Sequence, residues 1–195
     1  MVVRYDARKA CVKLTVPRYA SIKAGLDFAA SKTEWIAAQM EKEHRPAFAD
    51  GAVIPLFGEE VSIVHIGGRG VVRREGGTLL IAGDITFLER RVRDYIASEM
   101  LIFCKARAAL YAGQIGVKVA AISLRDTISH WGSCSASGRL SFCWRLAFMP
   151  LPVLDYVIAH EVAHLKHHNH SAAFWQVVKQ LCPEYTRWRK WLRAL

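Results

Sequence analysis

Residues 150–171 read PLPVLDYVIAHEVAHLKHHNHS, and this stretch determines the kind of fold that the chain can adopt. Pro152 suits the first turn of a helix, and the apolar residues that follow recur at helical spacing. His160 and His164 are four positions apart, about 6 Å along the axis of a helix, so their imidazoles project from one face and can share one cation. The stretch therefore predicts a helix that carries a metal site.

Glu161 completes the pattern His-Glu-x-x-His within this helix. In that pattern two imidazoles hold zinc, and the glutamate takes a proton from the water bound to the metal. The pattern predicts a hydrolase in which Zn²⁺ is the cofactor and Glu161 is the general base. The competing interpretation is a polar helix end that is merely rich in histidine.

A catalytic zinc commonly has three protein ligands and a fourth position left open. His170 is the first candidate for the third ligand. If the helix ends near residues 168–169, Asn169 tolerates the left-handed conformation that would turn His170 back toward the metal. Glu184 is the alternative, supplied by the next part of the chain, whereas His167 and His168 are expected to be solvated or to support the ligands.

The elements around this helix can also be predicted. Residues 86–113 should form one long helix, with Thr86 and Glu89 spaced as a capping box. Residues 117–131 and 139–148 read as two strands around a tight connection. Further helices are expected over residues 171–182 and 186–195. The expected buried positions are Leu88, Val92, Tyr95, Ile96, Phe103 and Leu110 on the long helix, and Leu140, Phe142, Trp144, Leu146 and Phe148 on the second strand.

The first part of the chain is richer in strand patterns. Residues 10–17 read as a strand, and Ser21 can cap a helix that runs to about Ala30. A second helix should follow, with Ser31 and Glu34 in capping-box spacing. Residues 50–83, divided by glycines, predict several short antiparallel strands.

Composition limits the class of protein. The 195 residues are enough for one domain with its own core, and five scattered cysteines without a C-x-x-C pair favour reduced thiols in the cytoplasm. We expect no signal peptide and no membrane span. The net charge is +10, and residues 101–195 carry 12 Lys/Arg against 4 Asp/Glu. This excess favours a nucleic-acid or nucleotide contact, or simply a solvated basic face on the closing helix; the pattern does not indicate an oligomeric state.

Three motifs in this order resemble the YgjP-like metallopeptidase family, which is related to the SprT-type and Wss1-type zinc proteases. They are WGSCSASGRLSFCWRL, MPLPVLDYVIAHEVAHLKHHNHSAAFW and CPEYTRWRKWL. The resemblance implies a single domain over residues 1–195 with a minimal zincin-like α+β fold. In that fold a β-rich lobe, residues 1–85, has helices packed on a helical catalytic half, residues 86–195. The family's zinc ligands fall on His160, His164 and His170, and its general base falls on Glu161. Cys143 and His130 stand where the family usually has Asn and Arg.

The interpretation is a cytoplasmic zinc-dependent metallopeptidase that acts on a peptide or protein. Three alternatives stay open: a zinc-dependent hydrolase of nucleotide phosphoanhydrides, a protease that acts on DNA-bound proteins, and a structural zinc protein in which Glu161 is dispensable. Cys134, Tyr156 and Tyr185 are expected to serve packing more than chemistry.

Overall fold

The structure, a computed structural model, describes residues 1–6, 11–42, 48–127 and 129–194. The chain divides into two compact units, Met1–Pro46 and Ala47–Leu195, and it mixes helices with sheets as an α+β protein does. The strands that directly precede residue 85 and the elements that follow it all fall in the second unit. The single domain with a lobe boundary at residue 85 stays a prediction.

The first unit is a strand pair with two helices: β1 (Val2–Asp6) antiparallel to β2 (Cys11–Thr15), then α1 (Ile22–Ala30) and α2 (Thr33–Lys42). The prediction that Ser21 caps a helix is confirmed, because its side chain accepts a hydrogen bond from the Ala24 amide at 3.1 Å. The capping box at Ser31 is wrong. Ser31 ends α1, and its hydroxyl donates to the Phe28 carbonyl.

The first sheet of the second unit has the order β3-β4-β6-β5. Its strands are β3 (Val53–Leu56), β4 (Glu59–Gly67), β5 (Arg73–Glu75) and β6 (Thr78–Ala82). Most neighbours are antiparallel as predicted, but β4 and β6 are parallel. The reason is that β6 is apolar along its length, with Leu79 and Ile81 fully buried, so it takes a central position and leaves the edge to the charged β5.

Helix α3 (Leu88–Ile115) follows a short 3₁₀ turn, η1 (Ile85–Phe87), which Asp84 caps, and the predicted capping box at Thr86 is wrong. The Asp84 carboxylate accepts from the Thr86 amide at 2.8 Å, so Thr86 is not the cap. The helix ends two residues beyond Gly113, where Gly116 has a φ of 68°. Leu88, Val92 and Ile96 are buried as predicted, whereas Leu110 is 49% exposed.

The second sheet has the order β7-β9-β8, formed by β7 (Ala121–Arg125), β8 (Gly132–Cys134) and β9 (Arg139–Cys143). The tight connection joins β8 to β9, while β7 pairs parallel to β9, so the predicted pairing of two long strands is wrong. The second predicted strand also stops early, because residues Trp144–Phe148 form a 3₁₀ helix, η2. Alternation of buried and exposed residues is therefore lost there, and Cys143 and Ala147 are buried.

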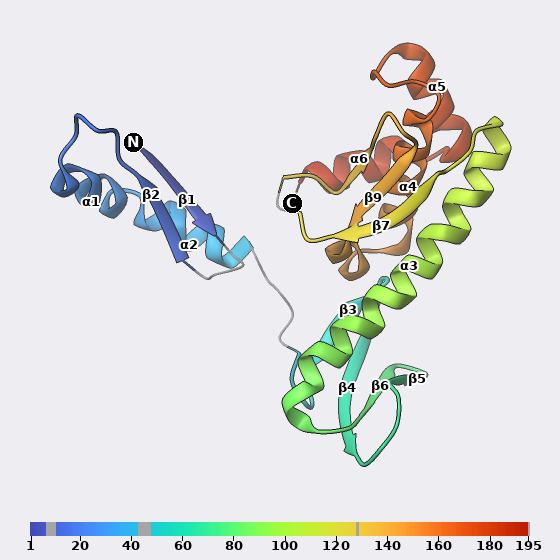
Figure 1. The fold of residues 1–195 in the computed structure, drawn as a ribbon, viewed down its shortest axis with the longest axis horizontal. Helices are drawn as coiled ribbons and strands as arrows, with labels where there is room; N and C mark the ends of the chain where they lie inside the picture. The colour runs from blue at the N-terminus through green and yellow to red at the C-terminus, as the bar shows by residue number, and fades with distance from the viewer. Residues whose placement is uncertain (7–10, 43–47, 128, 195) are drawn as a thin grey trace. The chain divides into compact units, whose positions relative to one another are not determined.

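Three helices close the chain: α4 (Leu151–His164), α5 (Ala172–Leu181) and α6 (Tyr185–Arg193), all three as predicted in place and order. Helix α4 contacts α3, α5, α6 and β8. In Figure 1, α3 runs past both sheets of the second unit, with its first half beside β6 and its second half beside β7 and α4. Among the helices of the described residues, none is both long and apolar enough to cross a membrane.

Candidate metal centre

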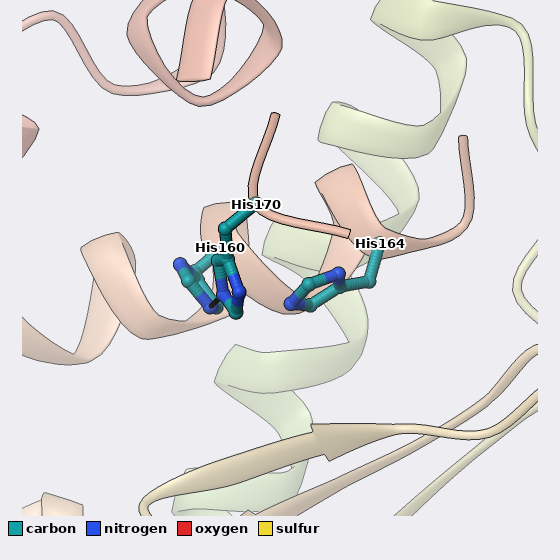
Figure 2. A group of neighbouring side chains, drawn as sticks. All are labelled: His160, His164 and His170. Carbon is teal, nitrogen blue, oxygen red and sulfur yellow. Dashed lines mark hydrogen bonds between the residues drawn. The ribbon is translucent and has the colours of Figure 1, made fainter. Parts of the chain in front are cut away.

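Three histidine side chains converge at the end of α4. One ligand atom from each of His160, His164 and His170 lies within 4.8 Å of the other two. His160 and His164 project from the last turns of α4, and His170 reaches them from the segment between α4 and α5 (Figure 2). The spacing of the first two follows from the helix, whereas the position of His170 depends on how the chain leaves it.

The chain leaves α4 by a route that differs from the predicted one. The α-helix ends at His164, and the amides of residues 165–167 bond to the carbonyls of Val162 and Ala163. Among the described non-glycine residues, Phe57 alone has a positive φ, so Asn169 does not use the left-handed conformation that we expected. His170 is instead placed by the start of α5, where the Ser171 hydroxyl accepts a hydrogen bond from the Phe174 amide at 3.4 Å.

His164 is oriented by a backbone contact. Its Nδ1 lies 3.1 Å from the carbonyl oxygen of His167, which is an acceptor only, so Nδ1 carries the hydrogen and donates it. The lone pair of Nε2 is then free and faces the other two histidines (Figure 2). A backbone carbonyl that fixes the tautomer in this way is the usual support of a metal-binding histidine.

The distance between the other two histidines fits a shared cation. Their Nε2 atoms are 3.2 Å apart, and two nitrogens on one tetrahedral zinc at 2.0–2.1 Å are separated by about 3.3 Å. His160 Nδ1 is buried and has no hydrogen-bond partner among the residues described. The donor set of three imidazoles suits Zn²⁺, and these residues could hold such an ion.

Aromatic side chains of α5 enclose the three imidazoles. The Phe174 ring is fully buried and its centroid lies 4.9, 4.5 and 4.9 Å from those of His160, His164 and His170. The indole of Trp175 stacks on His170 with centroids 5.6 Å apart and planes 26° apart. Sequence reasoning identified neither residue. The sequence does contain a signal for their position. Both residues come in the first turn of the helix that Ser171 caps, directly after His170, the predicted third ligand.

Glu161 lies beside the histidines on α4 and is only 6% exposed. The Cα of Gly132 in β8 is packed directly against it: a Cβ at that position would lie 2.6 Å from Glu161 Oε1 and 2.7 Å from its Cγ. A glycine is therefore required there by close approach and not by a positive φ. Nothing in the sequence indicated this contact, because the two residues belong to elements 29 positions apart.

Burial also shifts the pKa values at this centre. Burial is the largest of the effects that lower the pKa of His160 to about 3, and the neighbouring His164 and His170 also contribute. Burial also lowers the pKa of His164, partly offset by the hydrogen bond to the His167 carbonyl. Both imidazoles are therefore neutral near pH 7, which is the form that binds metals. Burial raises the pKa of the Glu161 carboxyl to about 8.

The remaining candidates lie outside the group of three. Glu184 begins α6 with a side chain 66% exposed, at 3.9 Å from an Arg187 nitrogen, and it does not belong to the described metal-ligand cluster. Cys134 also lies outside that cluster, and burial, then the Glu161 charge, raises the pKa of its thiol. Tyr185 stacks on Trp175 with centroids 5.4 Å apart, which is a packing role. His168 is exposed.

An ion pair fixes α4 against α3. Arg107 of α3 donates to both carboxylate oxygens of Asp155, at 2.5 and 2.8 Å, and the Tyr111 hydroxyl donates to Asp155 at 2.6 Å. Asp155 lies on α4, five residues before His160. The hydrogen bonds that Arg107 donates to Asp155 raise the pKa of the guanidinium above its usual value, so Arg107 stays charged.

Comparisons with known proteins agree with this picture in its coarse features. A family model described as a YgjP-like metallopeptidase domain matches residues 2–195. Among solved structures, the chain is similar to the metallopeptidase zymogen abylysin of Pyrococcus abyssi, with 18% identity and a TM-score of 0.43. That similarity covers 47% of this chain and 92% of the other. No curated protein matches the chain.

Proposed function

The chain belongs to the YgjP-like metallopeptidase family, and we propose that it is a zinc-dependent peptidase whose ligands are His160, His164 and His170 and whose general base is Glu161. The observation that carries the proposal is the convergence of three imidazoles within 4.8 Å, beside a buried carboxyl on the same helix. A helix that supplies two ligands and the base supports a zincin-like arrangement. The substrate is a peptide or protein.

Each residue has a defined part in the proposed mechanism. When bound, zinc supplies a Lewis acid that polarises a carbonyl and lowers the pKa of a water molecule to about 7. In its ionised form, the Glu161 carboxylate accepts a proton from the attacking water and returns it to the leaving amine. Gly132 and the surrounding apolar residues hold the Glu161 carboxyl in place and exclude bulk water from it. Phe174 and the His167 carbonyl keep the imidazoles oriented.

The setting of the protein forms part of the proposal. All five cysteines are unpaired, which supports a reducing compartment such as the cytoplasm. The closing helix packs Trp188, Trp191 and Leu192 against the core, which supports a docked helix with a solvated basic face; Leu195 lies outside the described residues. A nucleic-acid contact and hydrolysis of nucleotides remain alternatives for the experiments below.

Metal content of the purified protein is the first test. We expect about one zinc per chain in the wild type and in Glu184→Ala, and a large loss of zinc in His170→Ala. Zinc that is kept in His170→Ala but lost in Glu184→Ala would assign the third ligand to Glu184. A protein that takes up no zinc on reconstitution would overturn the proposal.

Activity is the second test, and Glu161→Gln is its matched control because it keeps the size of the side chain. We expect zinc-loaded wild type to cleave a denatured protein such as casein, and Glu161→Gln to retain zinc while its rate falls about 10²- to 10⁴-fold. A nucleotide panel assayed in parallel separates the alternative. Hydrolysis of nucleotides that depends on Glu161, without cleavage of casein, would replace the peptidase by a phosphoanhydride hydrolase.

A further inference from the structure

A pocket of about 170 Å³ opens beside His160 and Glu161. Its other walls come from three elements that are far apart in the sequence. Trp131 directly precedes β8 and Gly132 begins it, Tyr156 and Val157 lie on α4, and Leu192 lies on α6. We call this space the side-chain pocket. It touches the proposed base and one proposed ligand, so a group that enters it is next to the reacting bond.

Away from His160 and Glu161, the side chains of the walls are mainly apolar, and they are held in place. Tyr156 and Val157 are 5% and 4% exposed, and burial raises the pKa of the Tyr156 phenol to about 12, so the wall stays uncharged. The Trp131 ring has the Arg145 guanidinium over it at 5.8 Å, and Arg145 in turn donates to the Thr127 carbonyl. These contacts fix Trp131 although it lies in the chain that leads into an edge strand.

Charged groups near the pocket do not line it, apart from Glu161. Arg189 and Arg193 of α6 are close enough to the Tyr156 phenol to oppose the rise in its pKa, but neither contributes to the walls. Among the described residues, the walls themselves therefore supply no cationic side chain to a triphosphate. An apolar group can enter the pocket at little cost in desolvation, because only the Glu161 side carries a strongly hydrated group.

The volume limits the size of the occupant. Drug-sized ligands occupy pockets of about 300–1,000 Å³, and a nucleotide is of that class. An apolar protein cavity of about 150 Å³ binds benzene. A space of 170 Å³ is thus suited to one aliphatic or aromatic side chain and is too small to enclose a nucleotide.

We propose, on the basis of the proposed peptidase function, that the side-chain pocket receives one apolar side chain of the substrate, from a residue adjoining the scissile bond. It accepts Leu, Met or Phe, and it disfavours Gly, Asp and Lys. The expected preference for Leu over Gly is about 10- to 100-fold in kcat/KM, the range in which hydrophobic pockets discriminate. This assigns a specificity determinant to Trp131, Tyr156 and Leu192, which do not belong to the proposed metal set.

Leu192 is the residue to change, because it is only partly buried and lies on the last helix. Leu192→Trp should fill the pocket, and Leu192→Ala should enlarge it. Leu110→Trp is the matched control, because Leu110 is 49% exposed on α3 and does not line the pocket. Thermal unfolding followed by circular dichroism identifies any variant that does not fold.

Cleavage sites are then mapped by mass spectrometry in a peptide library, with zinc-loaded full-length proteins. The wild type and Leu110→Trp should enrich Leu, Met and Phe at one position next to the cleaved bond. Leu192→Trp should reduce that enrichment at least about tenfold in favour of small residues, and Leu192→Ala should admit Trp at the same position. Cleavage without an apolar preference, or a preference unchanged in both Leu192 variants, would overturn the pocket assignment and leave the peptidase proposal standing.

A binding measurement supplies a readout that does not depend on activity. 4-Fluorotoluene, observed by fluorine NMR, should bind saturably to wild type and to Leu110→Trp, but not to Leu192→Trp. Binding that persists in a folded Leu192→Trp would contradict the assignment of the pocket. If the wild type cleaves no peptide in the library, the peptidase proposal fails and the substrate preference fails with it, whatever the probe shows.

Discussion

The candidate centre combines groups whose reactivity depends on close neighbours and not on their position in a motif. Glu161 is buried against a backbone, His164 has its tautomer set by one carbonyl, and His170 is fixed between two aromatic rings. None of these neighbours is part of the His-Glu-x-x-His pattern. The motif therefore names the reacting groups, while their geometry is set by residues that a motif does not include.

Gly132→Ala tests this point at a single atom. The added Cβ would lie 2.6 Å from Glu161 Oε1, so the carboxyl must move, and a displacement of about 1 Å can lower a catalytic rate about 10²-fold. We expect a rate loss of about 10- to 100-fold on casein with about one zinc retained, measured by steady-state kinetics and elemental analysis.

The control is Gly113→Ala, a glycine in α3 where a Cβ would meet nothing within 4 Å. It should leave the rate unchanged. A Gly132→Ala protein of normal activity would show that the position of Glu161 is not limiting, and loss of zinc from it would indicate wider damage to the centre.

At the scale of elements, a hydrogen-bonded ion pair joins α3 to α4, the helix that carries His160 and His164. Asp155 receives three hydrogen bonds from Arg107 and Tyr111 and is partly buried, with 22% of its side chain exposed. These bonds connect the helix that carries the histidines to the longest helix of the fold. They do not touch the metal-binding atoms.

Asp155→Ala should lower the free energy of unfolding by about 2–3 kcal/mol, because it leaves the guanidinium and the hydroxyl without their acceptor. Urea unfolding followed by circular dichroism measures the change. Glu75→Ala removes an exposed ion pair with Arg73 and should cost about 1 kcal/mol or less. Equal costs for the two variants would contradict a structural role for the Asp155 network.

The elements also explain which predictions from sequence succeeded. The prediction of helix α4 succeeds because Pro152 suits its first turn and the apolar residues that follow recur at helical spacing, and α5 and α6 also lie where helices were expected. Ser31 was wrongly assigned as a cap because the same hydroxyl can bond the carbonyl of the preceding helix. Local sequence does not distinguish these two uses.

The wrong strand pairing has a non-local cause. Residues Trp144–Phe148 alternate as a strand would, but they form a 3₁₀ helix in which Trp144 and Phe148 pack edge to face at 5.2 Å. Leu110 fits the apolar spacing of α3 but lies on its exposed side, with 49% of its surface accessible. Of the candidate site, the three histidines and Glu161 could be predicted from spacing and resemblance, whereas Gly132 and Phe174 depend on tertiary contacts.

At the scale of the molecule, the core belongs to one unit. Every fully buried member of the hydrophobic core lies between Ile54 and Cys182, within Ala47–Leu195. Among residues 1–5 and 11–38, whose burial the structure describes, only Gly25 is buried. The unit that holds the proposed metal ligands is thus the one that has a core of its own.

A chain of residues 47–195 should therefore fold cooperatively and bind about one zinc. Thermal unfolding and elemental analysis, beside the full-length protein, provide the measurement. A separate chain of residues 1–46 should not fold, because it buries too little apolar surface to offset its conformational entropy. A shortened protein that is unfolded, or that lacks zinc while the full-length protein contains it, would contradict this division.

Helix α3 has a consequence for how the molecule opens. Its 28 residues extend about 42 Å, and its buried side chains, from Leu88 to Ile115, belong to one continuous core with both sheets. Neither sheet can detach without exposing part of this helix. Amide hydrogens along the buried side of α3 should therefore exchange with solvent only through global unfolding, with one common free energy of opening, and the two sheets should behave as a single cooperative unit in native-state exchange.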